Sequence, residues 1–325
     1  TEIYTLSLHD ALPICVKEGN TGRTNVTFTV GLSGPTADVL EIAYETVDTG
    51  TAKAATGDFE PVSGVLVFQP GELLKKITVA VLGDGIYEDH EQLVLRLDDP
   101  FDPNPMAVIE ATAVIENDDP IPAISVSDAS APWQDHDNDP STPPIQSEAG
   151  ELVFEVTLSN PSDRIITVAF RTDAATSALG LEVERAALPN VDFLMKSSPP
   201  LITFMPGETR QEIVIQTLDD DLDEHEEHFW IDLYNPEHAT IGDSRGVGLI
   251  ADDDAPVSVT IEPQSPKPGE PHTTQVSEGD AIQTSIFLDV MLSEQSGKTV
   301  TVTWATAPGT AVESVATGSG DFADY

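Results

Sequence analysis

The chain is built from a repeated pattern. Glu18, Glu148 and Glu278 recur at intervals of 130 residues, and a glycine follows each within two residues. Further blocks follow the first two glutamates in one order: an Asp-Phe pair (58–59, 192–193), a Pro-Gly-Glu triplet (70–72, 206–208), an acidic loop (83–91, 219–227) and a closing acidic run (117–119, 252–254). Four blocks in one order indicate tandem copies of one unit, and a unit of this length is a whole domain.

Between these blocks, apolar residues alternate with polar or small ones in short runs. The alternating residues are Val26, Phe28, Val30 and Leu32, then Ile77, Val79 and Val81, then Leu93, Leu95 and Leu97, and in the second copy Ile213, Ile215, Phe229, Ile231 and Leu233. A period of two in runs bounded by Gly, Pro, Asn and Asp predicts strands. About seven strands per repeat predict an all-β fold of tandem immunoglobulin-like antiparallel β-sandwiches.

The blocks divide the chain into four segments. They are residues 1–15, residues 16–119 (repeat 1, without its first strand), residues 120–255 (repeat 2, complete) and residues 256–325 (repeat 3, truncated). The closing acidic runs pass through proline into the next strand with almost no spacer. We therefore expect the repeats to be held stiffly end to end.

Residues 1–14 read TEIYTLSLHDALPI, which matches codon for codon the in-frame translation of a common short-read sequencing adapter. We interpret residues 1–15 as an artefact of that origin and not as part of the repeat. The alternative is a natural strand around residues 3–6. On the first interpretation the chain is an internal fragment of a longer protein, and the single cysteine, Cys15, carries no information on the redox compartment.

The chain is strongly acidic, with 57 Asp and Glu against 14 Lys and Arg and a net charge of −43. A field of this sign repels phosphate, which excludes nucleic acid and anionic membrane surfaces as expected partners. No apolar run reaches the roughly 18 residues that a membrane helix needs. One cysteine excludes a disulfide framework and a cysteine-based zinc site.

The acidic residues gather at strand ends. Alternate loops of a sandwich meet at one end, so the carboxylates of each repeat are expected to converge on one pole. In repeat 1 they are Glu18, Asp58, Asp84, Glu88, Glu91, Asp118 and Asp119; in repeat 2 they are Glu148, Asp192, Asp219, Asp220, Glu224, Glu227, Asp252, Asp253 and Asp254. Two carboxylates about 4 Å apart repel by about 4 kcal/mol at an effective dielectric constant of about 20, so a cation must offset the repulsion or the loops must separate.

An all-oxygen donor set favours a hard cation. Calcium accepts six to eight oxygens in flexible geometry, whereas magnesium demands a strict octahedron. Each set exceeds the need of one ion, so two or more ions per pole are reasonable. The alternative is a solvated acidic surface of a salt-adapted protein. The sequence His225-Glu226-Glu227-His228 does not indicate a zinc protease, because it lies at a strand entry and not on a helix.

As an ordered set, these blocks resemble the Calx-beta domain, a family that includes calcium-sensing domains of sodium–calcium exchangers. The resemblance covers two near-complete repeats and the first half of a third. It implies calcium bound at one end of each sandwich by the carboxylates above, with the backbone carbonyls of Ile86 and Leu222 as further ligands. Repeat 1 departs from the fuller pattern at Gly83 and Asn117, where repeat 2 has aspartates. We therefore expect repeat 1 to bind fewer ions, or to bind them more weakly.

Repeat 3 has only part of the set. Its matching positions are Glu278 and Asp324, with Asp321 as the competing alignment for the second. It lacks the acidic loop and the closing run, so this fragment is expected neither to bind calcium nor to fold well.

These expectations predict a non-enzymatic calcium-binding module of a secreted or cell-surface protein, with a membrane anchor only through regions outside the sequence. Calcium would rigidify loops and junctions for adhesion, matrix contact or cell communication, with surface proteins, matrix proteins or glycans as further partners. Two alternatives stay open: accessory repeats of a large secreted hydrolase, or calcium-sensing domains of a membrane transporter.

Overall fold

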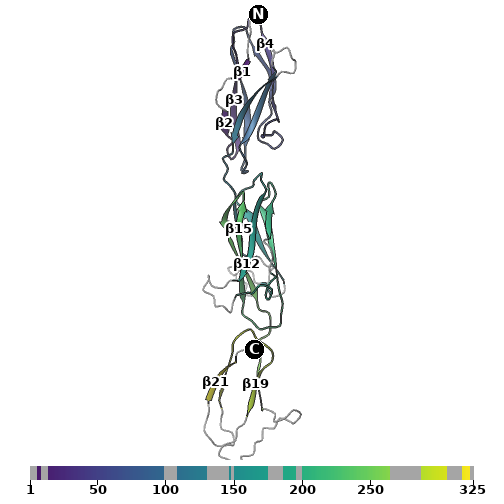
Figure 1. Ribbon diagram of the computed structural model, residues 1–325, viewed down its shortest axis with the longest axis vertical. Helices are drawn as coiled ribbons and strands as arrows, with labels where there is room; N and C mark the ends of the chain where they lie inside the picture. Colours follow the sequence, from purple (N-terminus) through teal and green to yellow (C-terminus); the bar gives the residue numbers. More distant parts are fainter. Residues whose placement is uncertain are drawn as a thin grey trace, which may run out of the picture.

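The computed structural model describes residues 6–8, 14–98, 108–129, 146–147, 150–174, 186–194, 200–263, 287–305 and 317–322. These residues form 21 strands and no helix, so the all-β prediction is confirmed. In Figure 1 the strands form three groups that follow one another along the long axis of the molecule, in the order of the sequence.

Repeat 1 is a sandwich of two sheets. Its strands are β1 (Leu6–Leu8), β2 (Ile14–Lys17), β3 (Gly22–Leu32), β4 (Leu40–Val47), β5 (Ser63–Phe68), β6 (Leu74–Gly83), β7 (Glu91–Asp98) and β8 (Val108–Glu116). One sheet has the order β1-β3-β6 and the other β2-β8-β7-β4-β5. All pairs are antiparallel except β2 with β8, which is parallel.

Repeat 2 has the same arrangement. Its strands are β9 (Ala123–Val126), β10 (Gln146–Ser147), β11 (Gly150–Leu158), β12 (Ile166–Ala174), β13 (Leu201–Phe204), β14 (Arg210–Thr217), β15 (Glu227–Glu237), β16 (Thr240–Asp243) and β17 (Arg245–Ala251). The sheets have the orders β14-β11-β9-β16 and β10-β17-β15-β12-β13. Apart from the added β16, each strand has its counterpart in repeat 1 at the same place in the sheet.

In repeat 1 the place of the first strand is taken by β1, which lies within the adapter-like residues 1–15, and the absence of a first strand of the repeat's own stays a prediction. In the structure β1 pairs antiparallel with β3, as β9 pairs with β11 in repeat 2. Antiparallel pairing uses backbone groups alone, so a short extended segment can add to the β3 edge whatever its origin. The adapter interpretation of residues 1–15 and the four segment boundaries stay predictions.

The alternating residues form the cores. All of those named from the sequence are buried, and they fall into two separate clusters, one in each of the first two sandwiches. Phe28 and Phe68 are fully buried in repeat 1, and Phe154 and Phe204 in repeat 2. Each sandwich therefore has its own hydrophobic core, as expected for tandem domains.

The described residues of repeat 3 form β18 (Val259–Pro263), β19 (Leu288–Leu292), β20 (Val300–Ala305) and β21 (Thr317–Phe322), with β18 paired to β19 and β20 paired to β21 in two separate sheets. Its apolar side chains are open to solvent: Phe287 is 66% exposed and Trp304 47%. Among the described residues after 251, no hydrophobic side chain is buried.

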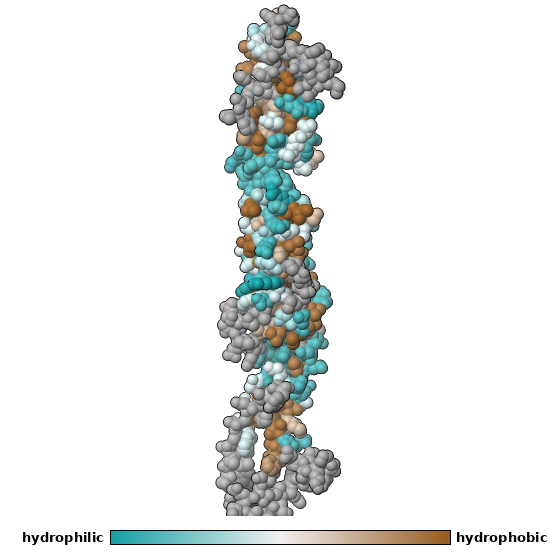
Figure 2. All heavy atoms as spheres, viewed as in Figure 1, coloured by the Kyte–Doolittle hydropathy of each residue, from teal (hydrophilic) through white to brown (hydrophobic). Residues whose placement is uncertain are grey.

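The same two kinds of loop meet at each of the two junctions between consecutive repeats. We call residues 83–91 and 219–227 the acidic loops, and residues 159–164 and 293–298 the docking loops. Tyr87 of the first acidic loop forms a parallel bridge with Ser162, and Asp223 of the second forms one with Ser296. Figure 2 shows hydrophilic residues gathered at the level where the first two sandwiches meet.

Candidate metal centre

Four segments of repeat 1 lie at the end of the sandwich that faces repeat 2. They are the turn between β2 and β3, the loop between β4 and β5, the acidic loop between β6 and β7, and the run after β8. The predicted carboxylates lie on these four segments. Among the described residues of repeat 2, Asp192, the acidic loop and the run after β17 meet at the end that faces repeat 3, because a sandwich brings alternate strand ends together.

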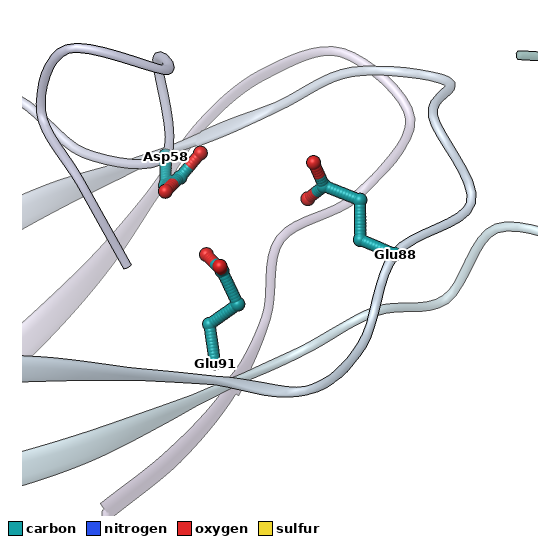
Figure 3. Close-up of side chains that lie close together, drawn as sticks. All are labelled: Asp58, Glu88 and Glu91. Atoms are coloured by element: carbon teal, nitrogen blue, oxygen red, sulfur yellow. The ribbon is translucent and has the colours of Figure 1, made fainter. Parts of the chain in front are cut away.

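Three carboxylates form the centre of the pole in repeat 1. Asp58, Glu88 and Glu91 each offer one oxygen, and these oxygens all lie within 4.8 Å of one another. Figure 3 shows the three side chains directed toward a common space, Asp58 from the loop between β4 and β5 and the two glutamates from the acidic loop. Asp58 is buried, whereas the two glutamates are half-buried. An ion in this space would have protein oxygens on several sides.

Repeat 2 has the same triad at the same positions. Asp192, Glu224 and Glu227 place their oxygens within 4.8 Å of one another. A hollow at this point is lined by Asp192, Leu218, Asp220, Glu224, His225, Glu227, Ile250 and Asp252. A cluster that recurs in two independently packed sandwiches is a feature of the repeat and not of one loop.

Local sequence explains how the aspartates are held. Each central aspartate precedes a fully buried phenylalanine, Phe59 in repeat 1 and Phe193 in repeat 2. The ring of Phe193 stacks on that of Phe229, with ring centroids 4.3 Å apart. The backbone N–H of Lys53 donates to Asp58 Oδ2 at 2.6 Å, and that of Leu188 donates to Asp192 Oδ2. The phenylalanine is thus an anchor in the core that fixes its neighbouring carboxylate at the pole.

The acidic loops share a turn. The backbone N–H of Ile86 donates to Asp84 Oδ1 at 2.8 Å, and the N–H of Leu222 donates to Asp220 Oδ1 at 2.8 Å. A carboxylate that accepts from the amide two residues on forms an Asx turn, which sets the direction of the loop. The role of the Ile86 and Leu222 carbonyls as ligands stays a prediction.

Three glutamates at the pole of repeat 1 are held in surroundings that disfavour their charged form. Burial, followed by the charges of Asp84 and its neighbours, raises the pKa of Glu18 to about 7. Burial, and then the charge of Asp58, raises the pKa of Glu88 to about 8. Burial and the hydrogen bond with Asp58 raise the pKa of Glu91 to about 7. Three carboxyl groups that resist ionisation at one point mark a place where positive charge would be favourable.

The pole of repeat 2 has the same tendency. Burial, and then the charges of Asp192 and Asp220, raises the pKa of Glu224. Burial, and then the charge of Asp252, raises the pKa of Asp254. Desolvation is thus the leading cause at both poles, and like charge adds to it.

Unpartnered oxygens test whether a cation fits. Glu18 is 3% exposed and its Oε1 has no hydrogen-bond partner; Asp119 is 7% exposed and its Oδ2 has none. In repeat 2, Asp254 Oδ2 is likewise without one. Buried polar atoms are normally satisfied, and buried carboxylates normally pair with a cation. The donor set is all oxygen, so the residues fit calcium.

The remaining predicted ligands are placed unevenly. Asp118 is exposed and accepts from the backbone N–H of Gly19 at 3.0 Å. Asp219 and Asp253 are exposed and do not line the hollow of repeat 2. Glu148, Glu278 and Asp324 lie outside the described residues. The full ligand set therefore stays a prediction, with the two triads as its best-placed members.

Sequence reasoning missed the groups that the next repeat adds to each pole. Arg164 of the first docking loop pairs with Asp89, and Lys298 of the second pairs with Asp223 and Asp252. The signal was present, because Leu-Ser-x-x-Ser-x-Arg at 158–164 matches Leu-Ser-x-x-Ser-x-Lys at 292–298. Asp223 itself is buried and was not among the predicted ligands.

A tandem array of β-sandwiches, with a pole of converging carboxylates on each of the first two, defines the class of protein. A family model described as the Calx-beta domain matches residues 14–119, 141–254 and 252–318. The chain therefore belongs to the Calx-beta family, which confirms the resemblance and its three tandem segments.

Several known proteins are similar to parts of the chain. Sodium/calcium exchanger 3 of Rattus norvegicus is 26% identical over 212 residues, which is 62% of this chain and 22% of that protein. Adhesion G-protein coupled receptor V1 of Danio rerio is 25% identical over 224 residues, 66% of this chain and 3% of the receptor. Sodium/calcium exchanger 2 of Homo sapiens is 41% identical over 56 residues, 17% of this chain and 6% of the exchanger. The chain thus spans less than a quarter of the length of these relatives.

Solved structures of Calx domains are also similar. The CBD12 structure from CALX1.2 is 18% identical, with 75% of this chain and 98% of that one covered and a TM-score of 0.30. The apo-form Calx CBD1 domain is 21% identical, with 42% and 100% covered and a TM-score of 0.32. Within the described part of the chain, there is no helix with the length and apolar character to span a membrane.

Proposed function

We propose that the chain is a non-enzymatic calcium-binding module, in which calcium at the poles of repeats 1 and 2 orders the acidic loops and stiffens the junctions. The observation that carries the proposal is the repeated triad, Asp58-Glu88-Glu91 and Asp192-Glu224-Glu227, whose oxygens lie within 4.8 Å of one another. The buried, unpartnered oxygens of Glu18 and Asp119 support it, because they need a cation or a proton.

The electrostatics explain why the ion would matter to stability. Without a cation, the glutamates of repeat 1 are held near one another with pKa values of about 7 to 8. A divalent ion that binds only the folded state removes the repulsion and stabilises that state by about 2.7 kcal/mol at a hundredfold excess over its dissociation constant. The predicted ligands of repeat 1 lie on four separate segments, so calcium at the pole would tie four loops together.

The setting that we propose is an extracellular or cell-surface protein, where calcium is structural and the module supports adhesion or cell communication. The similarity to an adhesion receptor supports this setting. Extracellular calcium modules commonly have dissociation constants of about 0.1–1 mM, which suits a permanently loaded site.

A second candidate is a calcium-sensing region of a membrane transporter. The observation that favours it is the similarity to sodium/calcium exchanger 3 over 62% of this chain. The two candidates differ in affinity, because a cytosolic sensor needs a dissociation constant of about 0.1–10 µM. A calcium isotherm of the whole chain therefore separates them.

The test of calcium binding is a thermal melt of the whole chain with chelator and then with rising calcium. We expect calcium to raise the melting temperature, and sodium chloride at matched ionic strength to raise it less. Sodium chloride screens surface charges without binding at a site, whereas a calcium ion held at the pole stabilises the folded state by binding to it. An equal effect of both salts would contradict the proposal.

A further inference from the structure

Three charged side chains lie in a row on the outer face of the larger sheet of repeat 1. They are Glu45 on β4, Arg96 on β7 and Glu110 on β8. Arg96 stands between the core residues Leu95 and Leu97, so its side chain points away from the core. Arg96 donates to Glu110 Oε1 from Nε at 3.1 Å and from Nη2 at 2.8 Å, and Glu45 is its direct neighbour in the register on the other side. We call these three residues the acid-base-acid triplet.

Repeat 2 has a row of three charges at the matching positions, with every sign reversed. They are Arg171 on β12, Asp232 on β15 and Arg245 on β17. The register is the same as in repeat 1, because the central residue pairs with the first residue on one side and with the third on the other. Arg245 donates from Nε to Asp232 Oδ1 at 2.7 Å, and Arg171 donates from Nη2 to Asp232 Oδ2 at 3.3 Å. We call these three residues the base-acid-base triplet.

The two arginines of the base-acid-base triplet are presented to solvent. The side chain of Arg171 is 62% exposed and that of Arg245 is 42% exposed. The guanidinium group of Arg245 lies over the ring of Trp230, with its Cζ 3.9 Å from the ring centroid. Trp230 and Asp232 thus fix its direction, which lowers the entropy lost when it binds a partner. Ion pairs this exposed contribute little to the stability of their own repeat, and a guanidinium group has five N–H donors, so donors remain for the carboxylates of a partner.

An exposed apolar side chain stands beside each triplet. Val65 on the edge strand β5 pairs with Ala43, and Leu201 on the edge strand β13 pairs with Ala169. Val65 and Leu201 are both more than half exposed. Each alanine comes two positions before the first residue of its triplet, so the two apolar side chains also occupy matching positions. The two faces therefore share one pattern of apolar and charged positions and differ in the sign of the charges.

This pattern makes the two faces complementary to each other. Neighbouring strands lie about 4.8 Å apart, so the charges have the same spacing in both triplets. When one face is laid on the other, each carboxylate of one row lies opposite a guanidinium group of the other row. The order of charges reads the same in both directions, so the match holds whether the facing sheets run parallel or antiparallel. A row placed on a copy of itself would bring like charges together, which disfavours that pairing.

The partner of each triplet belongs to another chain. Repeats 1 and 2 follow one another along the long axis of the molecule, so their outer faces do not meet within one chain (Figure 1). We propose that two copies of the chain associate side by side, with the acid-base-acid triplet of one on the base-acid-base triplet of the other. A pair of copies that makes this contact in both directions is a closed dimer with two-fold symmetry. The interaction goes beyond the calcium function and uses none of the predicted calcium ligands.

The net charge of the chain opposes this association. Two copies of a chain with a charge of −43 repel each other at long range. At a salt concentration of about 0.15 M the Debye length is about 8 Å, so charges far from the contact are screened, whereas ion pairs within it are screened much less. The test is therefore done at this salt concentration.

The first experiment measures self-association of the whole chain by sedimentation velocity, at concentrations up to about 100 µM, the range of weak and transient complexes. The parent is expected to associate. In one variant, Arg171→Glu, Asp232→Arg and Arg245→Glu give repeat 2 the pattern of repeat 1 and keep opposite charges adjacent within the row. Its self-association is expected to be at least about tenfold weaker, because like rows now face each other. A parent that stays monomeric, or a variant that associates as the parent does, would overturn the proposal.

The second experiment restores the match by mixing two variants. Glu45→Arg, Arg96→Asp and Glu110→Arg give repeat 1 the pattern of repeat 2, and this variant is also expected to lose self-association. An equimolar mixture of the two variants is expected to associate as the parent does, since every row of one variant then finds its complement in the other. A mixture that stays monomeric, although both variants melt as the parent does, would contradict the assigned contact.

Two further variants serve as controls. Arg171→Glu alone changes the most exposed charge of its row and is expected to weaken self-association roughly threefold or more. Unchanged association in this variant would overturn the proposal even where the triple variants fold poorly. Glu155→Arg with Arg210→Glu inverts an ion pair on the other sheet of repeat 2 and is expected to leave self-association unchanged. An equal loss in this variant would mean that the association does not depend on the proposed face.

Discussion

Neutralising Glu88 should stabilise the calcium-free protein and destabilise the calcium-loaded one. Glu88 lies half-buried in the triad of repeat 1, and burial together with Asp58 and Glu91 raises its pKa to about 8. The substitution Glu88→Gln keeps the shape of the side chain and removes its charge. A residue that serves only packing would not show opposite effects in the two states.

The magnitude follows from the raised pKa. Its folded value, about 8, exceeds the unfolded value of 4.5, so the group contributes stability that is fully present below about pH 4.5 and is lost as pH rises through about 8. Each unit corresponds to about 1.4 kcal/mol, but the side chain is only half-buried and its neighbours titrate with it. We discount the total to about 1–2 kcal/mol at about pH 8.5. For a sandwich of this size that is a shift of roughly 5–10 °C in melting temperature.

The assay is differential scanning calorimetry of parent and Glu88→Gln at about pH 5.5 and about pH 8.5, each with chelator and with millimolar calcium. In chelator, the variant should melt higher than the parent at the upper pH and close to it at the lower. In calcium the order should reverse. Glu41→Gln, an exposed carboxylate on β4, is the matched control and should change stability by less than about 0.5 kcal/mol. A variant that is less stable in chelator at the upper pH, or one that keeps the full calcium gain, would refute the reasoning.

Three further outcomes follow from the site and its support. In calorimetry, Glu224→Gln should lose most of the calcium-dependent stabilisation of repeat 2, whereas the exposed Glu212→Gln should keep it. If Glu224→Gln kept the full stabilisation, the triad would not be the site. Phe193→Ala should cost repeat 2 about 3–5 kcal/mol and weaken its calcium response with every carboxylate intact, because the fully buried ring anchors Asp192; an unchanged melt and isotherm would argue against that anchoring. Magnesium at the concentration of calcium should stabilise the chain much less, since it tolerates neither the ligand number nor the irregular geometry, and equal melting curves would contradict a calcium site.

The strands could be predicted because one physical requirement decides them. A residue such as Phe28 or Ile215 must face the core at every second position, and the sequence shows that period directly. The poles could be predicted for a related reason, since a sandwich fixes which strand ends meet. The sequence therefore predicted that Asp58 and Asp192 lie at the poles, each beside the phenylalanine that anchors it, and the structure places each within a cluster of three carboxylates.

Which of the neighbouring carboxylates line the hollow was less predictable. Asp219 and Asp253 have the same residue type and the same loops as Asp220 and Asp252, yet only the latter two line the hollow of repeat 2. For Asp219 and Asp220 the difference depends on the direction of the acidic loop, which the turn at Leu222 sets. Sequence spacing carries no information on that direction.

The sequence marks the docking loops by the matching blocks at 158–164 and 292–298, but it does not show which residues of the preceding repeat these loops contact. Lys298 and Asp252 are 46 positions apart, and no period or block relates them. Their contact depends on how one sandwich is seated on the next. The strand β1 is a similar case, because its pairing with β3 uses backbone groups that any extended segment offers.

The most direct test of the account is a count of calcium ions by equilibrium dialysis. The parent chain and the double variant Asp58→Asn with Asp192→Asn are compared at free calcium up to a few millimolar, the range of extracellular sites. The account predicts saturable binding of at least three ions by the parent, with more in repeat 2 than in repeat 1, and loss of most of it in the double variant. Linear, non-saturating uptake that is equal in both proteins would mean that the acidic poles are only a counterion atmosphere, and would contradict the central claim.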